Sequence, residues 1–335
     1  MHASEQALDA TIFVVVTNYR TPKDTEDTIR SLQASSYPHV RICVVDNGSG
    51  DDSVTHLRSC FPDLLILEVP SNEGVARAYN RGLRRAQQEG AGYILILNSD
   101  VELDHHCLAE LVRRAGAPDQ PVMLAPLMYY FQPRDKMWFA GGGLNRESLD
   151  YFHCETADEF RRLPMPDRYI TACAMFMTRE AARRAGLYDE RFFMYWDDTD
   201  YSVTAVGQGV KLDMVETALL YHKISSSTGG LGALSPFKAY HMLRSSLIFW
   251  RKHLSWWRFH RDYCEGHLGK WVNQLPVWWN DEKRRPAAEA IMDAVWYILT
   301  LRNVPLQRPR SPDWFRWLMR TRPWLVARWM SFRMC

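Results

Sequence analysis

The sequence predicts an α/β protein built on a mostly parallel sheet flanked by helices, followed by a helical C-terminal region. Apolar, β-branched runs without polar alternation recur along the first hundred residues, as expected of strands buried on both faces. Segments with helical spacing separate these runs, which implies right-handed crossovers between parallel strands. Near residue 235 the chain becomes basic and rich in tryptophan, which predicts a boundary between domains 1–235 and 236–335.

The N-terminal half alternates strands and helices in order. Strands are expected at 11–16, 40–45, 64–69 and 93–97, and helices at 24–34, 51–60 and 75–88. Each strand ends in polar or glycine-containing residues, so one edge of the sheet is lined with hydrogen-bonding groups. Ligands of open α/β sheets bind beyond the carboxyl ends of the strands, and we therefore expect the site at this edge.

The middle of the chain is less regular. It predicts helices at 104–115, 179–184 and 198–206 and strands at 169–177, 210–214 and 218–221. The polar, glycine-rich stretch 225–232 is typical of a mobile lid over a site.

Composition narrows the class of protein. Among its 335 residues, 1–239 carry a net charge of −8 (24 minus 32), whereas 240–335 carry +10 (17 minus 7). The seven cysteines are odd in number and form no C-x-x-C, which favours reduced thiols over a disulfide framework or a zinc site. No apolar run suits a signal peptide or approaches the roughly 18 residues of a membrane span, so a cytoplasmic location is expected.

Several familiar site motifs are absent. The first strand is followed by no G-x-G-x-x-G, and the chain has neither G-x-x-x-x-G-K-[ST] nor G-x-S-x-G. These absences argue against a dinucleotide fold, a P-loop protein and a serine hydrolase elbow. Carboxylates and amides at the strand ends remain as the candidates for chemistry.

Two of these carboxylates directly follow buried strands. Asp46 can accept the N3–H of a uracil or thymine ring, or it can cap the following helix. Asp100 can bind a divalent metal, because Mg²⁺ and Mn²⁺ prefer oxygen ligands, or it can cap a helix instead.

A second cluster of acids lies beside aromatic residues at 192–200. Asp197 and Asp198 can cap the helix that begins there, or one of them can be a general base whose pKa neighbouring acids and burial raise. His222 follows a short strand and is either a metal ligand or a lone structural histidine.

The order of these motifs resembles that of inverting family 2 glycosyltransferases, and most closely the bacterial rhamnosyltransferases of polysaccharide assembly. The matching segments span roughly residues 11–250, and they are 14–20, 44–49, 72–76, 97–100, 196–200 and 221–222. The resemblance implies a GT-A fold and transfer of rhamnose from dTDP-rhamnose to a saccharide or lipid-linked saccharide. A UDP-sugar donor, and a non-catalytic sugar- or nucleotide-binding protein on the same scaffold, remain as alternatives.

The resemblance also implies roles for individual residues. Asp198 matches the catalytic base, while Asp100 and His222 match the ligands of a divalent metal, Mn²⁺ or Mg²⁺. Trp196 and Asp197 fall on the acceptor side. The residues that fall where the family contacts the donor are Thr17, Tyr19, Arg20, Asp46, Asn72, Gly74, Asn80 and Ser99.

This chain departs from the family pattern at three positions. Asn98 replaces the first acid of the family's D-x-D, which predicts weaker metal binding or binding through Asp100 and His222. Asp197 replaces the usual glutamate, and Arg244-Ser245 stands where many relatives have Arg-Asn. A rival reading, a nucleotidyltransferase, is disfavoured because its usual glycine-rich loop is missing after the first strand.

The C-terminal region suggests a partner surface. Tryptophan and arginine residues are interleaved along 314–335. This pattern is typical of helices at a membrane interface, where the arginine side chains reach the lipid headgroups. We expect a peripheral position on the inner face of a membrane, although a packed helix pair or a homodimer contact would give the same pattern. Nucleic acid is not an expected partner, because no recognition module is evident.

Overall fold

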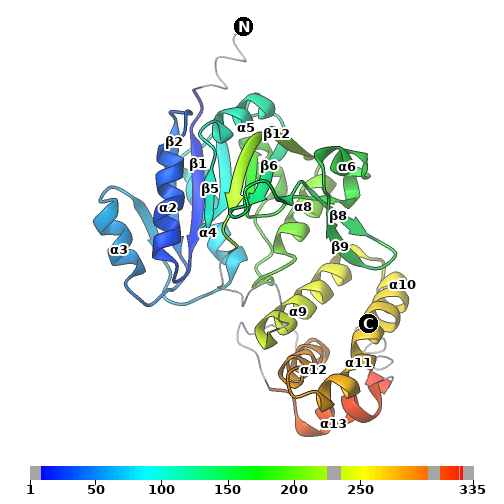
Figure 1. Ribbon diagram of the computed structural model, residues 1–335. Coiled ribbons are helices and arrows are strands. Elements are labelled where there is room, and N and C mark those ends of the chain that lie inside the picture. Colours follow the sequence, from blue (N-terminus) through cyan, green and yellow to red (C-terminus); the bar gives the residue numbers. More distant parts are fainter. Residues whose placement is uncertain (1–8, 225–234, 301–309, 324, 327–335) are drawn as a thin grey trace. The chain divides into compact units, whose positions relative to one another are not determined.

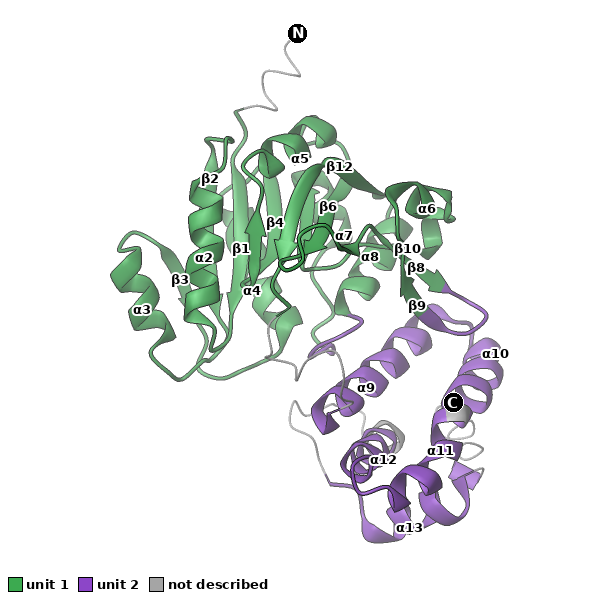
Figure 2. Ribbon diagram, in the orientation of Figure 1, with its two compact units in different colours: residues 1–144, 151–190, 197–225 green, residues 145–150, 191–196, 226–335 purple. Residues whose placement is uncertain are grey.

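The computed structural model describes residues 9–224, 235–300, 310–323 and 325–326, without the side chains of 270 and 297–300. It contains two compact units (Figure 2). Unit 1 comprises residues 1–144, 151–190 and 197–225, and unit 2 comprises 145–150, 191–196 and 226–335. The expected lid at 225–232 lies outside the described residues, and the predicted domain boundary at 235 stays a prediction.

Unit 1 is organised around one large twisted sheet (Figure 1). Its strands are β1 (Ile12–Asn18), β2 (Val40–Asp46), β3 (Leu65–Glu68), β4 (Tyr93–Asn98), β5 (Val101–Leu103), β6 (Val122–Tyr130), β7 (Met137–Phe139), β11 (Ala174–Thr178) and β12 (Lys211–His222). A smaller sheet orders β10 (Arg168–Tyr169), β8 (Gly142–Asn145) and β9 (Asp150–His153).

Helices follow about half of the strands of unit 1. They are α2 (Pro22–Gln33), α3 (Ser53–Cys60), α4 (Val75–Gln88), α5 (Cys107–Ala115), α6 (Ala157–Arg162), the 3₁₀ turn η1 (Met165–Asp167), α7 (Arg179–Ala185) and α8 (Asp197–Gly207). One close approach is between α4 and β1, where a Cβ added at Gly82 would lie 2.2 Å from Cγ1 of Val15. A glycine at this position therefore lets α4 pack directly on the buried face of β1.

The order of the strands indicates where a ligand site is expected. The large sheet runs β3-β2-β1-β4-β11-β6-β12-β5, and β1 pairs in parallel with both β2 and β4. The order reverses between β1 and β4, and a crevice opens at such a switch point beyond the carboxyl ends of the strands. The first four strands and their helices confirm the prediction of a mostly parallel sheet flanked by helices.

Other elements differ from the sequence-based prediction. β12 is a single strand with an irregularity between Val215 and Leu219, where two short strands were expected. The expected strand 169–177 is divided between β10 and β11. β6 was not predicted, because Pro126 lies within it, and a proline is unusual inside a sheet.

Unit 2 is helical as predicted. It contains α9 (Pro236–His253), α10 (Trp256–Arg258), the π-helical η3 (Phe259–His267), α11 (Leu268–Asn280), α12 (Arg285–Thr300) and α13 (Asp313–Thr321). Arg316, expected among arginines facing headgroups, is instead buried and donates to Asp293 Oδ1 at 2.8 Å. Burial favours this pairing because an unpaired charge would be costly there. Among the described helices, none combines the length and apolarity of a membrane span.

Candidate active site

At the ends of β1 and β2, a buried polar cluster fixes the carboxylate of Asp46. The side-chain amide of Asn18, fully buried, donates to Asp46 Oδ2 at 2.6 Å and to Ser49 Oγ at 3.1 Å. Ser49 donates to the same carboxylate from its backbone N–H at 3.0 Å and from its hydroxyl at 2.5 Å. Asp46 therefore holds the loop after β2, and α3 begins later, with Asp52 at its N-cap position.

Arg20 extends this cluster toward solvent. Its Nε donates to the carbonyl of Ser49 at 2.9 Å, and its backbone N–H donates to Ser49 Oγ at 3.0 Å. The backbone of Arg20 has a φ of 58°, a left-handed conformation that is uncommon for a residue with a side chain. Tyr19 is exposed beside it, with the guanidinium 5.2 Å from the ring centroid, whereas Thr17 is partly exposed.

The loops after β2 and β3 meet at the same edge. The amide of Asn47 donates to Asn72 Oδ1 at 3.1 Å and to the carbonyl of Gly74 at 3.3 Å. A Cβ added at Gly48 would lie 2.3 Å from the backbone of Ser71, so the close approach of these two loops requires glycine at position 48. Gly74, with φ 88°, stands at the N-cap of α4. Two predicted donor residues, Asn72 and Gly74, thus lie beside the Asp46 loop.

Asn80 makes contacts that the sequence did not suggest. It is fully buried on α4 and exchanges hydrogen bonds with the backbone of Tyr188, donating at 3.0 Å and accepting at 2.8 Å. Its amide also donates to Glu190 Oε1 at 3.1 Å. Since both ends of this amide bind protein groups, Asn80 anchors the segment at 188–190.

At the end of β4, Asp100 lies against His222. The carboxylate Oδ1 and the imidazole Nε2 are 3.2 Å apart, and both residues are buried. The antiparallel pairing of β12 with β5 explains this contact, because His222 is opposite Val101 in the register. Ser99, next to Asp100, is partly exposed with its hydroxyl 3.1 Å from that of Thr21.

A buried cysteine, Cys173, contacts His222 as well. Burial lowers the pKa of His222, but the neighbouring Cys173 and Asp100 outweigh burial and raise it to about 10. Nδ1 of His222 finds no hydrogen-bond partner among the described residues. An imidazole and a carboxylate are both kinds of group that divalent cations bind, and the aromatic ring of Trp138 is centred 4.4 Å from that of His222.

Asp198 lies at the same edge of the sheet, beside the chain that leads into β11, the strand that pairs with β4. The backbone N–H of Asn98 donates to the carbonyl of Cys173 at 3.0 Å. One residue earlier, the backbone N–H of Ala172 donates to Asp198 Oδ2 at 3.3 Å. Asp198 Oδ1 accepts from the backbone N–H of Thr199 at 2.7 Å, within the first turn of α8. The structure thus brings Asp198 to the strand end that leads to Asp100.

Asp197 differs from Asp198 in its surroundings. It is 6% exposed, and burial, followed by the charge of Asp198, raises the pKa of its carboxyl well above the usual range. Asp198 is more accessible, with intermediate exposure. Burial and the charge of Asp198 therefore favour the protonated form of Asp197, while Asp198 is the more accessible of the two side chains.

Trp196, predicted on the acceptor side, belongs to unit 2 and is 5% exposed. Its ring packs against Phe249 and Trp250, with centroids 4.8 and 5.8 Å away. Tyr195 and Trp196 both have left-handed backbones, with φ of 64° and 63°. The segment before Asp197 is therefore held in an unusual conformation by the packing of unit 2.

Three residues of the site were not singled out from the sequence. Asn18 and Ser49 lie inside the motifs 14–20 and 44–49, and their polarity at a strand end was the available signal. Cys173 gave no such signal, because it precedes an apolar strand and reaches His222 only through the pairing of β11 with β4.

Comparison with known proteins finds one matching family model and several relatives. A family model described as Glycosyl transferase family 2 matches residues 13–186. The N-acetylglucosaminyl-diphospho-decaprenol L-rhamnosyltransferase of Mycobacterium tuberculosis (strain ATCC 25618 / H37Rv) is 25% identical over 266 residues, 73% of this chain and 86% of the relative. The dTDP-rhamnosyl transferase RfbF of Shigella flexneri is 21% identical over 257 residues, 73% of this chain and 81% of the relative.

Two solved structures share the fold. The mannosyltransferase PcManGT from Pyrobaculum calidifontis, in complex with GDP-Man and Mn²⁺, has a TM-score of 0.54 and 15% identity over 96% of this chain and 87% of that chain. GalNAc-T7, with UDP, GalNAc and Mn²⁺, has a TM-score of 0.56 and 17% identity over 75% of this chain and 50% of that chain. Both are GT-A glycosyltransferases, and at this identity the likeness shows the fold alone.

Proposed function

This chain is a glycosyltransferase that belongs to glycosyl transferase family 2, and on that premise we propose that it transfers L-rhamnose from dTDP-rhamnose to a saccharide hydroxyl. The names of the two relatives, both rhamnosyltransferases, support the sugar. The name of the mycobacterial relative contains a diphospho-decaprenol, which supports a lipid-linked acceptor here.

One observation carries the proposal: a carboxylate–imidazole pair and an accessible carboxylate lie at the same edge of the sheet. Asp100 and His222 lie 3.2 Å apart, and Asp198 accepts a hydrogen bond from the N–H of Ala172, just before β11, the strand that pairs with β4. Transfer with inversion needs a base on the acceptor side and stabilisation of the leaving diphosphate on the donor side. The two groups supply these two functions.

We assign Asp198 as the general base. Its carboxylate takes the proton of the acceptor hydroxyl while that oxygen attacks the anomeric carbon of the donor. The bond from this carbon to the diphosphate oxygen breaks in the same displacement, so the sugar is transferred with inverted configuration and the nucleoside diphosphate leaves. Burial and the charge of Asp198 raise the pKa of Asp197, which favours the protonated form of Asp197 and makes Asp198 the better candidate for the base.

Asp100 and His222 are the groups that would hold a divalent metal. One carboxylate and one imidazole suit Mn²⁺, and Mg²⁺ is commonly held by one or two carboxylates together with substrate phosphates. When bound, such a metal would neutralise charge on the donor diphosphate. The amide of Asn98, in place of an acid, leaves the site with less negative charge than a D-x-D pair.

The Asp46 cluster is the proposed site for the base of the nucleotide. Asn18 and Ser49 orient the carboxylate, which still has acceptor capacity for the N3–H of thymine or uracil. Arg20 and Tyr19 lie at the exposed rim of this cluster, where a nucleotide would enter. A thymine or uracil nucleotide is therefore the expected donor class.

Substitution of Asp198 tests the assignment of the base. General-base catalysis contributes roughly 10²–10⁴ in rate, so Asp198→Asn should lower kcat by that factor. Its Kd for the nucleoside diphosphate should stay within about twofold of wild type, since nucleotide binding involves the other groups. Glu102→Gln, which removes a carboxylate paired with Arg134 at the surface, is the matched control. Full turnover by Asp198→Asn would exclude this residue as the base.

We further propose that unit 2 binds a membrane surface. Five of its tryptophans are at least 37% exposed, namely Trp256, Trp257, Trp271, Trp314 and Trp317. The surrounding segment 240–335 carries a net charge of +10 (17 minus 7), which favours anionic headgroups. Such a surface would bring the active site to a lipid-linked acceptor.

Flotation with liposomes tests this surface. The wild type should float with vesicles that contain anionic lipid and stay in solution with neutral vesicles or at high salt. The double variant Trp314→Ala/Trp317→Ala should float less, whereas Leu187→Ala, an exposed apolar position of unit 1, should behave like wild type. Failure of the wild type to float with anionic vesicles would overturn the membrane proposal and leave the transferase proposal intact.

A further inference from the structure

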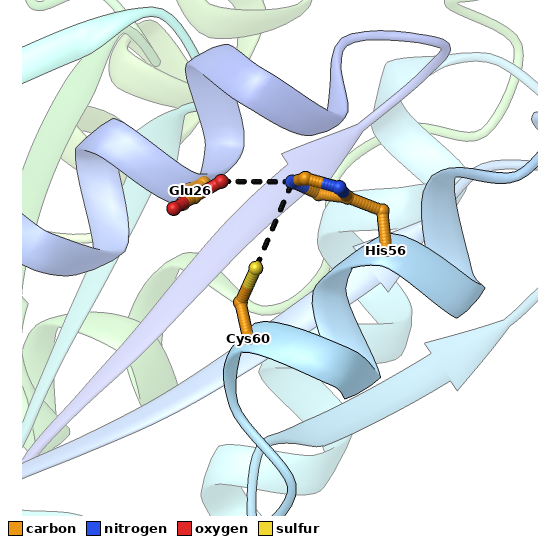
Figure 3. A group of neighbouring side chains, drawn as sticks. All are labelled: Glu26, His56 and Cys60. Carbon is orange, nitrogen blue, oxygen red and sulfur yellow. Dashed lines mark hydrogen bonds and ion pairs between the residues drawn. The ribbon is translucent and has the colours of Figure 1, made fainter.

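Three side chains that could bind a metal meet between α2 and α3 (Figure 3). Glu26 lies on α2, and His56 and Cys60 lie on α3, four residues apart and therefore on the same face of that helix. His56 Nε2 is 2.8 Å from Glu26 Oε2 and 3.8 Å from Cys60 Sγ. The ligand atoms of all three residues lie within 4.8 Å of one another, and all three are partly exposed.

These separations suit one small cation. Zinc binds histidine nitrogen, carboxylate oxygen and cysteine sulfur at about 2.0–2.3 Å in tetrahedral geometry, which puts N and O about 3.3 Å apart and N and S about 3.6 Å apart. The observed 2.8 and 3.8 Å differ from these values by amounts that small side-chain movements can close. Because His56 and Glu26 are partly exposed, such movements meet little resistance.

The remaining carboxylate oxygen of Glu26 is already held in place. Arg30, one turn along α2, donates to Glu26 Oε1 from Nε at 3.0 Å and from Nη2 at 2.7 Å. This pairing leaves Oε2 facing His56, and outer partners of this kind fix the orientation of metal ligands in proteins.

Cys60 is also the most suitable thiol of the described part of the chain. Of the six free cysteines there, Cys60 alone is partly exposed, while the others are buried. A soft thiolate combined with an imidazole favours zinc over the hard cations Mg²⁺ and Ca²⁺. The donor set therefore differs in kind from the Asp100–His222 pair at the end of β4.

We propose that Glu26, His56 and Cys60 form a zinc site that fastens α3 to α2, with water in the fourth position. The two helices follow the strand ends that carry Arg20 and Ser49, so the metal would stiffen the part of the fold that supports the Asp46 cluster. Zinc would thus stabilise the folded enzyme without entering the transfer reaction. Three protein ligands with a water molecule in the fourth position is a coordination that zinc adopts in proteins.

Titration of the tag-free, reduced full-length protein with Co²⁺ tests the site directly. We expect a thiolate-to-cobalt charge-transfer band and the visible bands of tetrahedral cobalt, saturating at one equivalent and displaced by Zn²⁺. Cys60→Ser should abolish the charge-transfer band. His56→Ala should weaken binding by more than the roughly 10–100-fold typical of losing an outer partner.

Two controls separate this site from other metal binding. His39→Ala removes an exposed histidine whose Nε2 lies 3.8 Å from Asp9, and it should titrate like wild type. Asp100→Ala should keep the thiolate band, because the donor-side pair is a different site. A wild type without the band, or a Cys60→Ser variant that retains it, would overturn the proposal. A thermal melt of each variant without metal confirms that it is folded.

Discussion

Replacing Asn18 with aspartate tests how the polar cluster at the end of β1 is held together. The amide of Asn18 donates to Asp46 Oδ2 at 2.6 Å in a fully buried position. Asn18→Asp has almost the same shape, but it sets an oxygen without a proton against the Asp46 carboxylate. Two ionised carboxylates this close repel each other strongly, so the folded variant will retain one proton.

The free-energy cost of keeping this proton bound depends on the pH. An aspartate with an ordinary pKa of about 3.9 needs about 1.36 kcal/mol for each pH unit above that value to stay protonated, or about 5 kcal/mol at pH 7.5 and about 2 kcal/mol at pH 5.5. The pKa of the shared proton is raised in the folded state, so the variant regains stability as the pH falls and loses it as the pH rises. Asn18→Ala, which removes the donor without adding charge, should cost about 1–3 kcal/mol at both pH values.

Urea unfolding of wild type and both variants at pH 5.5 and 7.5 measures these differences. The loss in unfolding free energy for Asn18→Asp should exceed that for Asn18→Ala at pH 7.5 and approach it at pH 5.5. A loss for Asn18→Asp that is below about 1 kcal/mol, or that is the same at both pH values, would refute the contact between Asn18 and Asp46.

Two further predictions concern a close contact in unit 1 and a buried histidine in unit 2. Gly82→Ala should destabilise the fold by about 1–3 kcal/mol, because its Cβ would lie 2.2 Å from Cγ1 of Val15. Val15→Ala in the same chain should recover part of this loss, and a double-mutant cycle from urea unfolding measures the coupling. In unit 2, burial and then the charge of Arg244 lower the pKa of His241 to about 4. Between about pH 6.5 and 4 only the unfolded state takes up this proton, so stability should fall by up to about 1.4 kcal/mol per pH unit, and His241→Gln should flatten the profile in tryptophan-fluorescence melts.

The sequence predicted the parallel half of the fold because its signals are local. Uninterrupted apolar runs mark β1, β2 and β4, and polar residues at their ends mark the edge where the site lies. The placement of Asp46 and Asp100 at that edge follows from strand direction alone. The structure then shows that neither residue caps the helix that follows it, since α3 begins after Asp52 and α5 after His106.

Long-range pairing explains what the sequence could not predict. The position of His222 beside Asp100 depends on the antiparallel register of β12 and β5, which joins residues 122 positions apart. Cys173 reaches the site only because β11 pairs with β4. Neither contact produces a periodic pattern in the sequence, so residue spacing can identify single candidates such as Asp100 and His222 but not the side chains that they contact.

For a related reason, the sequence could not predict which side chains of unit 2 are buried. The alternation of tryptophan and arginine in α13 suggested an exposed basic face, and Trp314 and Trp317 are indeed exposed. Arg316 turns inward because Asp293, on α12, supplies a buried partner. A charge pattern on one helix gives no information about a partner on another helix.

The most direct test of the central claim is a thermal-shift panel with dTDP, UDP, GDP and CDP, each with and without Mn²⁺. A ligand that binds only the folded state adds about 2.7 kcal/mol of stability at 100 times its Kd. We predict a metal-dependent shift with dTDP that is lost in Asp100→Ala and kept in Glu102→Gln. A shift with UDP alone would move the donor to a UDP-sugar, and no shift with any of the four nucleotides would contradict a nucleotide-sugar site at this edge of the sheet.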